Sequence, residues 1–278
     1  MQPHLYRKAK PFYLNSPHGK LFAIYHPPQV DYVPRECFLY IQPFGEEMNR
    51  CRQMVALQAR EFSKLGYGCL LLDLYGTGDS DGEYQDGNWD IYLADLHTGL
   101  QWLAAEGYDS VRLWAIRHGA LLALDLARTL TTPCKLLFWQ PVLNGKTAVT
   151  QILRIALAGS LSDENKTSMG ELRKLIQENA TIELSGYETA GSLLATFEAK
   201  HVSDFNNTPN LEIQWFEVLA STEQNRTKES IQVEQLWKNA CTPIHYETVI
   251  GPAFWQVWER VVADNLITKT NAWAQQSR

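Results

Sequence analysis

The sequence predicts an α/β protein with a mostly parallel central sheet flanked by helices. Three observations lead to this fold class. Short apolar runs typical of strands alternate with longer segments of helical period over most of the chain, which is the pattern of βαβ units. Glycine or proline follows most of these runs and ends them. The chain has 278 residues, of which 45% are hydrophobic, so a sizeable core can be buried.

The predicted strands are short runs rich in apolar side chains. The first of them ends at Pro27 and Pro28, and we expect it to pair antiparallel with its neighbour. Most of the others are expected to run parallel, because helical segments separate many of them. In chain order the predicted strands span residues 21–26, 37–41, 68–72, 111–116, 135–139, 211–218 and 243–250.

The predicted core helices lie between these strands and end at turn-forming residues. Trp89, Leu93 and Leu96 fall on one face of an amphipathic segment that Gly107 ends. Gly66 is the predicted C-cap of an earlier helix. The helices span residues 48–65, 89–106, 118 to about 130, and 255 to about 271.

Residues 147–205 differ from the rest of the chain. Helical periods, polar breaks such as 162–165 and a Gly186-Tyr187-Glu188 turn replace the strand–helix alternation. We therefore divide the chain into a first part of the core, a helical cap insertion and a return to the core. These three segments are residues 1–146, 147–208 and 209–278. We expect the cap over the carboxyl ends of the strands, where open α/β sheets bind ligands.

Composition and charge exclude several classes of protein. The formal net charge is −6, with no long run of one sign, so no nucleic-acid partner is expected. The five cysteines form no C-x-x-C pair, which argues against a disulfide framework or a zinc ribbon. Residues 1–4 lack the apolar segment of a signal peptide, and no apolar run is long enough to span a bilayer. We expect a cytoplasmic protein without a transmembrane segment.

The segment from Asp73 to Gly82 follows a predicted strand and has the pattern D-x-x-G-x-G-x-S-x-G. A phosphate-binding loop is not expected, because Asp79 and Asp81 would repel a phosphate and the Gly-x-Gly-x-x-Gly spacing is incomplete. The pattern is instead a structural turn common after the fourth strand of α/β-hydrolases. Its glycines supply backbone angles that other residues adopt only at a cost. The segment therefore predicts a fold and no activity.

Residues 111–122 predict a buried strand, a sharp turn and a helix. This is the layout of the nucleophile elbow, G-x-S-x-G, of the α/β-hydrolases. Here the register gives Ala115-x-Arg117-x-Gly119, with arginine in place of the serine. Arginine stays protonated and is no nucleophile. Two interpretations are open: Arg117 binds an anion at the start of the helix, or a glutamate merely neutralises it.

The loop of residues 42–49 lies where this fold places half of the oxyanion hole. The backbone N–H groups of Phe44 and His118 are the predicted donors. Either of the adjacent residues Glu46 and Glu47 could start the next helix, because acids favour the first turn. One of them could also pair with Arg117, since a buried charge needs a partner. In an active enzyme Arg117 and these two glutamates would be the candidate catalytic residues.

The other two triad positions also depart from the α/β-hydrolase pattern. The loop of residues 251–256, where this fold places its histidine, contains Trp255 and no histidine. We expect Trp255 and Gln140 to border the pocket. The acid position offers Glu223, with Glu217 a weaker choice. Ordinary Ser-His-Asp hydrolysis is therefore not expected, and the scattered histidines give no motif for a metal or another cofactor.

Together these residues resemble one α/β-hydrolase subfamily, the exosortase A system-associated hydrolase 2. The resemblance covers most of the chain and rests on six segments: residues 43–49, 54–60, 73–80, 117–123, 139–142 and 254–256. It includes the arginine at the elbow. The resemblance implies a bacterial protein linked to protein sorting and exopolysaccharide production, with an exosortase-system protein or an acyl carrier as a partner. Fold analogy alone does not decide activity.

Two hypotheses about function follow. In the first, the protein hydrolyses or handles an ester or thioester, with Arg117 holding an anionic group and Glu46 or Glu47 activating water. In the second, the pocket binds an acyl or anionic small molecule, or a partner's tail, without turnover. Labelling by a probe for activated serines would contradict both hypotheses.

Overall fold

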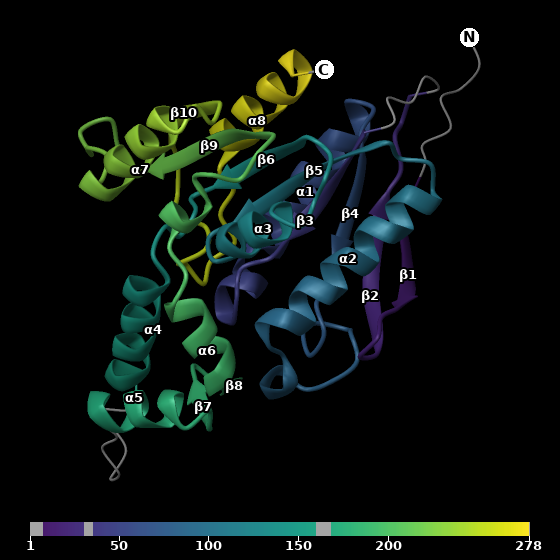
Figure 1. The fold of residues 1–278 in the computed structure, drawn as a ribbon. Helices are drawn as coiled ribbons and strands as arrows, with labels where there is room; N and C mark the ends of the chain where they lie inside the picture. Colours follow the sequence, from purple (N-terminus) through teal and green to yellow (C-terminus); the bar gives the residue numbers. More distant parts are fainter. Residues whose placement is uncertain (1–7, 31–35, 160–167, 278) are drawn as a thin grey trace.

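A computed structural model describes residues 8–30, 36–159 and 168–277. Its centre is an eight-stranded sheet with the order β1-β2-β4-β3-β5-β6-β9-β10 (Figure 1). β2 pairs antiparallel with both β1 and β4, and the pairs from β4 to β10 are parallel. The predicted fold class is confirmed. The strands are β1 (Lys10–Asn15), β2 (Lys20–His26), β3 (Glu36–Ile41), β4 (Gly68–Leu72), β5 (Ser110–Ile116), β6 (Cys134–Trp139), β9 (Leu211–Leu219) and β10 (Ile244–Ile250).

Helices cover both faces of this sheet. α1 (Glu46–Lys64) and α8 (Asp264–Gln276) pack on one face. α2 (Trp89–Ala105), α3 (Gly119–Ala127) and α7 (Lys228–Asn239) pack on the other. Two apolar layers result, and the central strands are buried on both sides. This double burial explains why those strands are nearly continuous apolar runs in the sequence.

Side chains of β3 illustrate the two layers. Phe38 points toward α1 and stacks on Phe62, with ring centroids 3.7 Å apart. Its neighbour Leu39 points to the opposite face and belongs to the other layer. Burying one such side chain contributes about 1.5–3 kcal/mol. The alternation leaves the strand ends, rather than the strand faces, as the place for a site.

The insertion forms a separate group of elements at one end of the sheet, teal to green in Figure 1. Helices were expected there, and the structure adds a two-stranded hairpin whose strands are four residues each. The polar break at 162–165 lies outside the described residues, and the three-segment division remains a prediction. The elements are α4 (Gly145–Gly159), α5 (Met169–Gln177), β7 (Thr181–Leu184), β8 (Tyr187–Ala190), α6 (Gly191–Glu198) and a short 3-10 helix (Val202–Phe205).

The start of the last helix was predicted wrongly. α8 begins at Asp264, and residues 255–263 form a loop. Phe254 and Trp255 turn into the core, and Arg50 donates to the Gln256 carbonyl at 2.6 Å, an oxygen that a helix would bond internally. β1 and α7 were not predicted, although Thr227 caps α7 through the Ser230 N–H.

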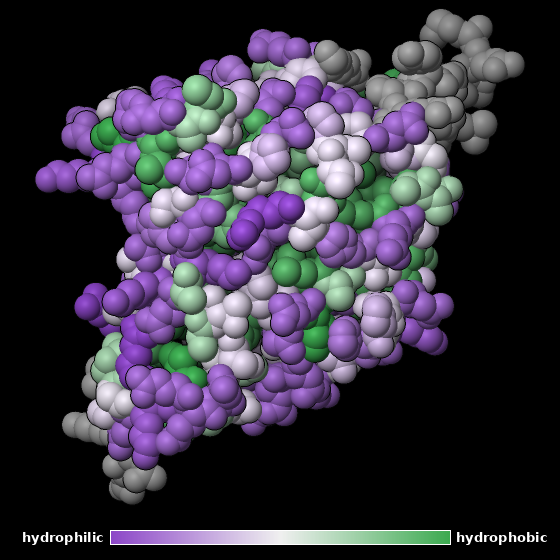
Figure 2. Space-filling view, in the orientation of Figure 1, coloured by the Kyte–Doolittle hydropathy of each residue, from purple (hydrophilic) through white to green (hydrophobic). Residues whose placement is uncertain are grey.

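No described helix is both long and apolar enough to cross a bilayer. The face drawn in Figure 2 is mostly hydrophilic, with apolar residues in small separate patches. Scattered apolar side chains of this kind are ordinary on protein surfaces.

Candidate functional site at the strand-to-helix elbow

Arg117 occupies the tip of the bend between β5 and α3. Its φ is +53°, a left-handed conformation that a non-glycine residue seldom adopts. The backbone is held from both sides, because its N–H donates to Trp139 O at 3.1 Å and its carbonyl accepts from Val142 N at 3.0 Å. A Cβ at Gly119 would lie 2.5 Å from Ile41 O, so the helix needs glycine there. The predicted elbow therefore has its strained geometry with arginine at the tip.

The Arg117 guanidinium is ion-paired with Glu47. Nε lies 3.0 Å from Oε2, and Nη2 lies 3.4 Å from Oε1. Nη1 donates to the Gln140 carbonyl at 3.4 Å, and the Trp255 ring lies 5.4 Å from the guanidinium carbon. Three of the five N–H groups thus have described partners. The other two have no described partner, and the Arg117 side chain remains 16% exposed.

The two glutamates have different partners. Both lie in the first turn of α1, which Gly45 allows the chain to enter at a φ of +58°. Glu47 forms the ion pair with Arg117. Glu46 accepts a hydrogen bond from the Tyr187 hydroxyl of β8 at 3.2 Å and lies 3.6 Å from Arg50 Nε. Glu46 therefore connects the core to the insertion, and Glu47 alone faces the elbow.

His118 follows Arg117 and is enclosed by aromatic rings. Its ring stacks on Phe44, with centroids 5.8 Å apart, and meets the edge of Phe197 from α6. Nδ1 lies 3.6 Å from Glu47 Oε2 without a hydrogen bond. Burial, together with the Arg117 charge and against that of Glu47, lowers the His118 pKa to about 4. The imidazole is consequently neutral at pH 7 and does not compete with Arg117 for an ion pair with Glu47.

The Phe44 and His118 N–H groups were the predicted oxyanion donors. The structure brings the two residues together through their rings, and neither N–H donates to a described residue. Arg117, which directly precedes His118, offers no nucleophile. Their role as oxyanion donors stays a prediction.

The predicted histidine loop and acid loop follow β10 and β9. Phe254 and Trp255 are buried after β10, and Phe254 packs on Trp139 with centroids 6.1 Å apart. Glu223 lies exposed in a turn after β9. Glu217, the weaker choice from the sequence, is only 3% exposed and accepts a hydrogen bond from the Tyr246 hydroxyl. Burial, with Glu217 adding its charge, raises the pKa of that hydroxyl.

A cavity of about 210 Å³ lies beside the elbow at the carboxyl ends of β5, β6 and β9. Gln140 borders it, with a φ of +46° and with its side-chain Oε1 accepting from Val218 N at 2.6 Å. Trp255 reaches the guanidinium but is not in the lining. The lining comprises Arg117, 140–144, Thr147, Ala148, Gln151, Trp215, Glu217, Thr227, Glu229 and Ser230.

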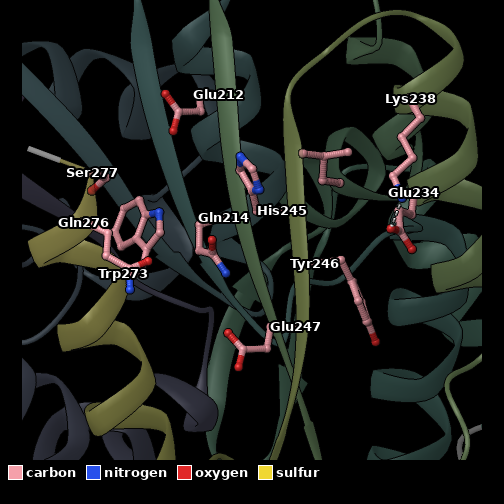
Figure 3. A pocket seen from close by; sticks show the side chains of 11 residues that line it. Glu212, Gln214, Glu234, Lys238, His245, Tyr246, Glu247, Trp273, Gln276 and Ser277 are labelled. Carbon is pink, nitrogen blue, oxygen red and sulfur yellow. Dashed lines mark hydrogen bonds and ion pairs between the residues drawn. The ribbon is translucent and has the colours of Figure 1, made fainter.

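A larger cleft of about 640 Å³ surrounds the edge strand β10 (Figure 3). It contains none of the predicted site residues. His245 and Tyr246 extend from opposite faces of the strand. The acidic side chains have cationic partners, with Glu247 2.6 Å from Lys269 and Glu234 2.6 Å from Lys238. Among the described residues, no group of histidine, cysteine or acidic side chains is arranged to hold a metal ion.

Comparisons with known proteins identify the fold. No family model matches the chain, and no curated protein sequence matches it. Solved esterase structures do match. Est1E from Butyrivibrio proteoclasticus, with ferulic acid bound, is 17% identical, covers 96% of this chain and 97% of its own, and has a TM-score of 0.62.

Two further esterases agree with this result. Esterase Pf2001 from Pyrococcus furiosus is 14% identical, with coverage of 97% and 90% and a TM-score of 0.63. A carboxyl esterase from Bacillus coagulans is 12% identical, with coverage of 97% and 99% and a TM-score of 0.64. Likeness at such low identity concerns the fold alone. The chain therefore has the α/β-hydrolase fold.

Proposed function

We propose that this protein is a non-catalytic member of its fold that binds a small acyl or carboxylate ligand beside Arg117. The observation that carries the proposal is the Arg117–Glu47 ion pair at the elbow tip. A guanidinium is a permanent cation with a planar set of donors and suits carboxylate recognition. The same group has no nucleophilic lone pair at neutral pH.

The surroundings of the elbow argue against catalysis. Both Glu47 oxygens already accept N–H groups of Arg117, so less of their capacity remains for a water molecule. His118 is neutral but enclosed between Phe44 and Phe197. Phe254 fills the loop that would carry the histidine base. A general base needs a proton within hydrogen-bond reach, and no described group supplies that arrangement at Arg117.

The cavity supports a binding role. It lies at the carboxyl ends of the strands, where open α/β sheets bind ligands. Two Arg117 N–H groups have no described partner, and Gln140 adds polar atoms to the same wall. The resemblance to the exosortase A-associated group favours an acyl chain, free or on a carrier protein of that system, as the physiological ligand.

Paired turnover and binding measurements test the proposal. A fluorophosphonate probe and a panel of ester and acyl-thioester substrates should give no labelling and no turnover. Calorimetry with butyrate and hexanoate should detect binding that Arg117→Gln weakens about tenfold or more, as loss of a charged hydrogen-bonding partner would. Arg128→Gln, an exposed arginine on α3's C-cap, is the matched control.

A second candidate function is thioester or ester hydrolysis by water, with Glu47 as general base. The N–H groups of Phe44 and His118, without described partners, favour it, because they could hold an oxyanion. Turnover that disappears in Glu47→Gln and in Arg117→Gln, yet survives in Arg128→Gln, would replace the binding proposal by this one.

A further inference from the structure

We propose that the ligand of the elbow cavity carries a positively charged amine, which Glu217 binds, while its acyl or carboxyl end faces Arg117. The ligand class is then an amino acid or an aminoacyl group. This inference rests on the proposed function, because it names the chemistry of the same cavity. The main evidence for this inference is the carboxylate of Glu217 and not the elbow.

Glu217 is a buried carboxylate without a described cationic partner. It is 3% exposed, lines the cavity and accepts one described hydrogen bond, from the Tyr246 hydroxyl. A buried carboxylate is costly unless it is paired with a cation or well hydrogen-bonded. One neutral hydroxyl meets only part of that need. An ammonium group in the cavity would supply the missing charge.

The neighbouring cation Arg226 contacts Tyr246 and forms its ion pair with a different glutamate. Arg226 stacks on the Tyr246 ring at 3.3 Å, but its guanidinium pairs with Glu234 at 2.7 Å and donates to Ser230 O. Glu229 adds a second carboxylate to the lining. Since Glu47 already neutralises Arg117, the charges around the cavity sum to a negative value. The field therefore favours a ligand with a cationic group.

The sheet register places the two charged residues at the same level. Ile116 pairs with Trp139, and Trp139 pairs with Phe216. Arg117 and Glu217 each follow by one residue, on strands separated by β6 alone. Two strand spacings put their backbones about 10 Å apart. The inference requires a short chain, with a carboxyl group at one end and an amine at the other, that spans the space between these two positions.

Trp215 gives the cationic end of this cavity an aromatic wall. It lines the same space and lies two residues before Glu217 on the same face of β9. Aromatic rings attract ammonium groups, most strongly where water is excluded. Arg117, at the other end of the cavity, does not attract an ammonium group. The lining is therefore asymmetric and fixes the orientation of a molecule with unlike ends.

Matched ligands test the inference on the unaltered chain. Calorimetry would compare 4-aminobutyrate with butyrate and butylamine, and 6-aminohexanoate with hexanoate and hexylamine. The tighter of the two amino acids should bind about tenfold or more above its matched acid and amine, because it satisfies both charges. Equal binding of the amino acid and its matched acid overturns the inference and leaves the proposed function standing. Absence of binding by every acid and amino acid overturns both.

Variants of the carboxylate give an independent measurement. Glu217→Gln preserves shape and removes charge, so the preference for the amino acid should disappear while butyrate binding persists. Tyr246→Phe keeps the carboxylate and removes its described donor, and the preference should remain. Glu106→Gln, an exposed glutamate at the C-cap of α2, is the matched control. A preference that survives Glu217→Gln would contradict the assignment.

Discussion

Two arginines of the same strand–turn segment, Arg112 and Arg117, have contrasting surroundings. Arg112 lies near the start of β5 and is fully buried. It donates to Glu36 Oε2 at 2.7 Å and to the Ser277 carbonyl at 2.9 Å. The rings of Tyr67 and Trp273 lie 4.9 and 5.4 Å from its guanidinium carbon. Arg117 has one carboxylate and one aromatic ring, and it also faces a cavity.

The difference separates an arginine that belongs to the core from one that we propose binds a ligand. Arg112 joins β5 to β3 and to the end of α8, so its guanidinium is part of the core. Arg117 pairs with a single acidic side chain, in the first turn of α1, and two of its N–H groups have no described partner. Burial of a cation is thus a sign of a site only where a cavity adjoins it.

The largest effect expected from this comparison is the loss of stability on removing Arg112. Arg112→Ala leaves Glu36 without its partner and opens a space between aromatic rings. Breaking a buried pair in this way costs about 3–5 kcal/mol. Urea denaturation would measure it, with Arg128→Ala as the exposed control, expected within about 0.5 kcal/mol of the unaltered chain. A cost below that of an ordinary surface substitution would break the comparison.

His118 should make the elbow region sensitive to acid. Its pKa is lowered to about 4 in the folded chain, from 6.5. Below pH 6.5 the unfolded chain binds the extra proton first, so stability falls as the pH drops and levels off below about 4. The shift corresponds to about 3 kcal/mol.

His118→Phe is the variant that isolates this effect, because it keeps an aromatic ring against Phe44. Denaturation between pH 7 and pH 4 should show a flatter loss of stability than in the unaltered chain. If the free energy of unfolding depends on pH equally in the two proteins, the His118 pKa is not lowered by folding.

A smaller and more diagnostic effect is expected from Glu47→Gln. The partly buried Arg117 cation loses its charged partner, which should cost about 1–3 kcal/mol. Butyrate should then bind more tightly, because an anion can replace the lost carboxylate. Calorimetry and denaturation on the same variant measure both effects. Weaker butyrate binding would mean that Glu47 contacts the ligand instead of competing with it.

The sequence predicted the fold and the elbow but not the surroundings of Arg112, and this difference has physical reasons. The parallel sheet and the elbow follow from local patterns, namely apolar runs, helical periods and the Arg117-x-Gly119 turn. The burial of Glu217 cannot be predicted from local patterns, because Tyr246 and α7 come to it from other parts of the chain. The pairing of Arg112 with Ser277 cannot be predicted in this way either, because it joins residues 165 positions apart.

Other misses concern local signals that were weak or misleading. The β7–β8 hairpin has strands of only four residues, too short for a clear alternation. Residues 255–263 have helical composition, but Phe254 and Trp255 are drawn into the core and Arg50 takes a carbonyl of the segment. Tertiary contacts therefore override local propensity in the loop whose Trp255 contacts Arg117.

The smallest expected effect concerns the residue at the elbow itself. Arg117→Ser restores the side chain that the strand-to-helix bend carries in serine hydrolases, at a backbone already shaped for it. Labelling by a fluorophosphonate should nevertheless stay at the background of Arg117→Ala. A serine hydroxyl is a weak nucleophile without an adjacent base, Phe254 fills the histidine loop, and the His118 ring is enclosed by Phe44 and Phe197. Labelling well above that background would mean that a base activates the introduced serine. The arginine at position 117 would then account for the absence of serine-hydrolase chemistry in the unaltered chain.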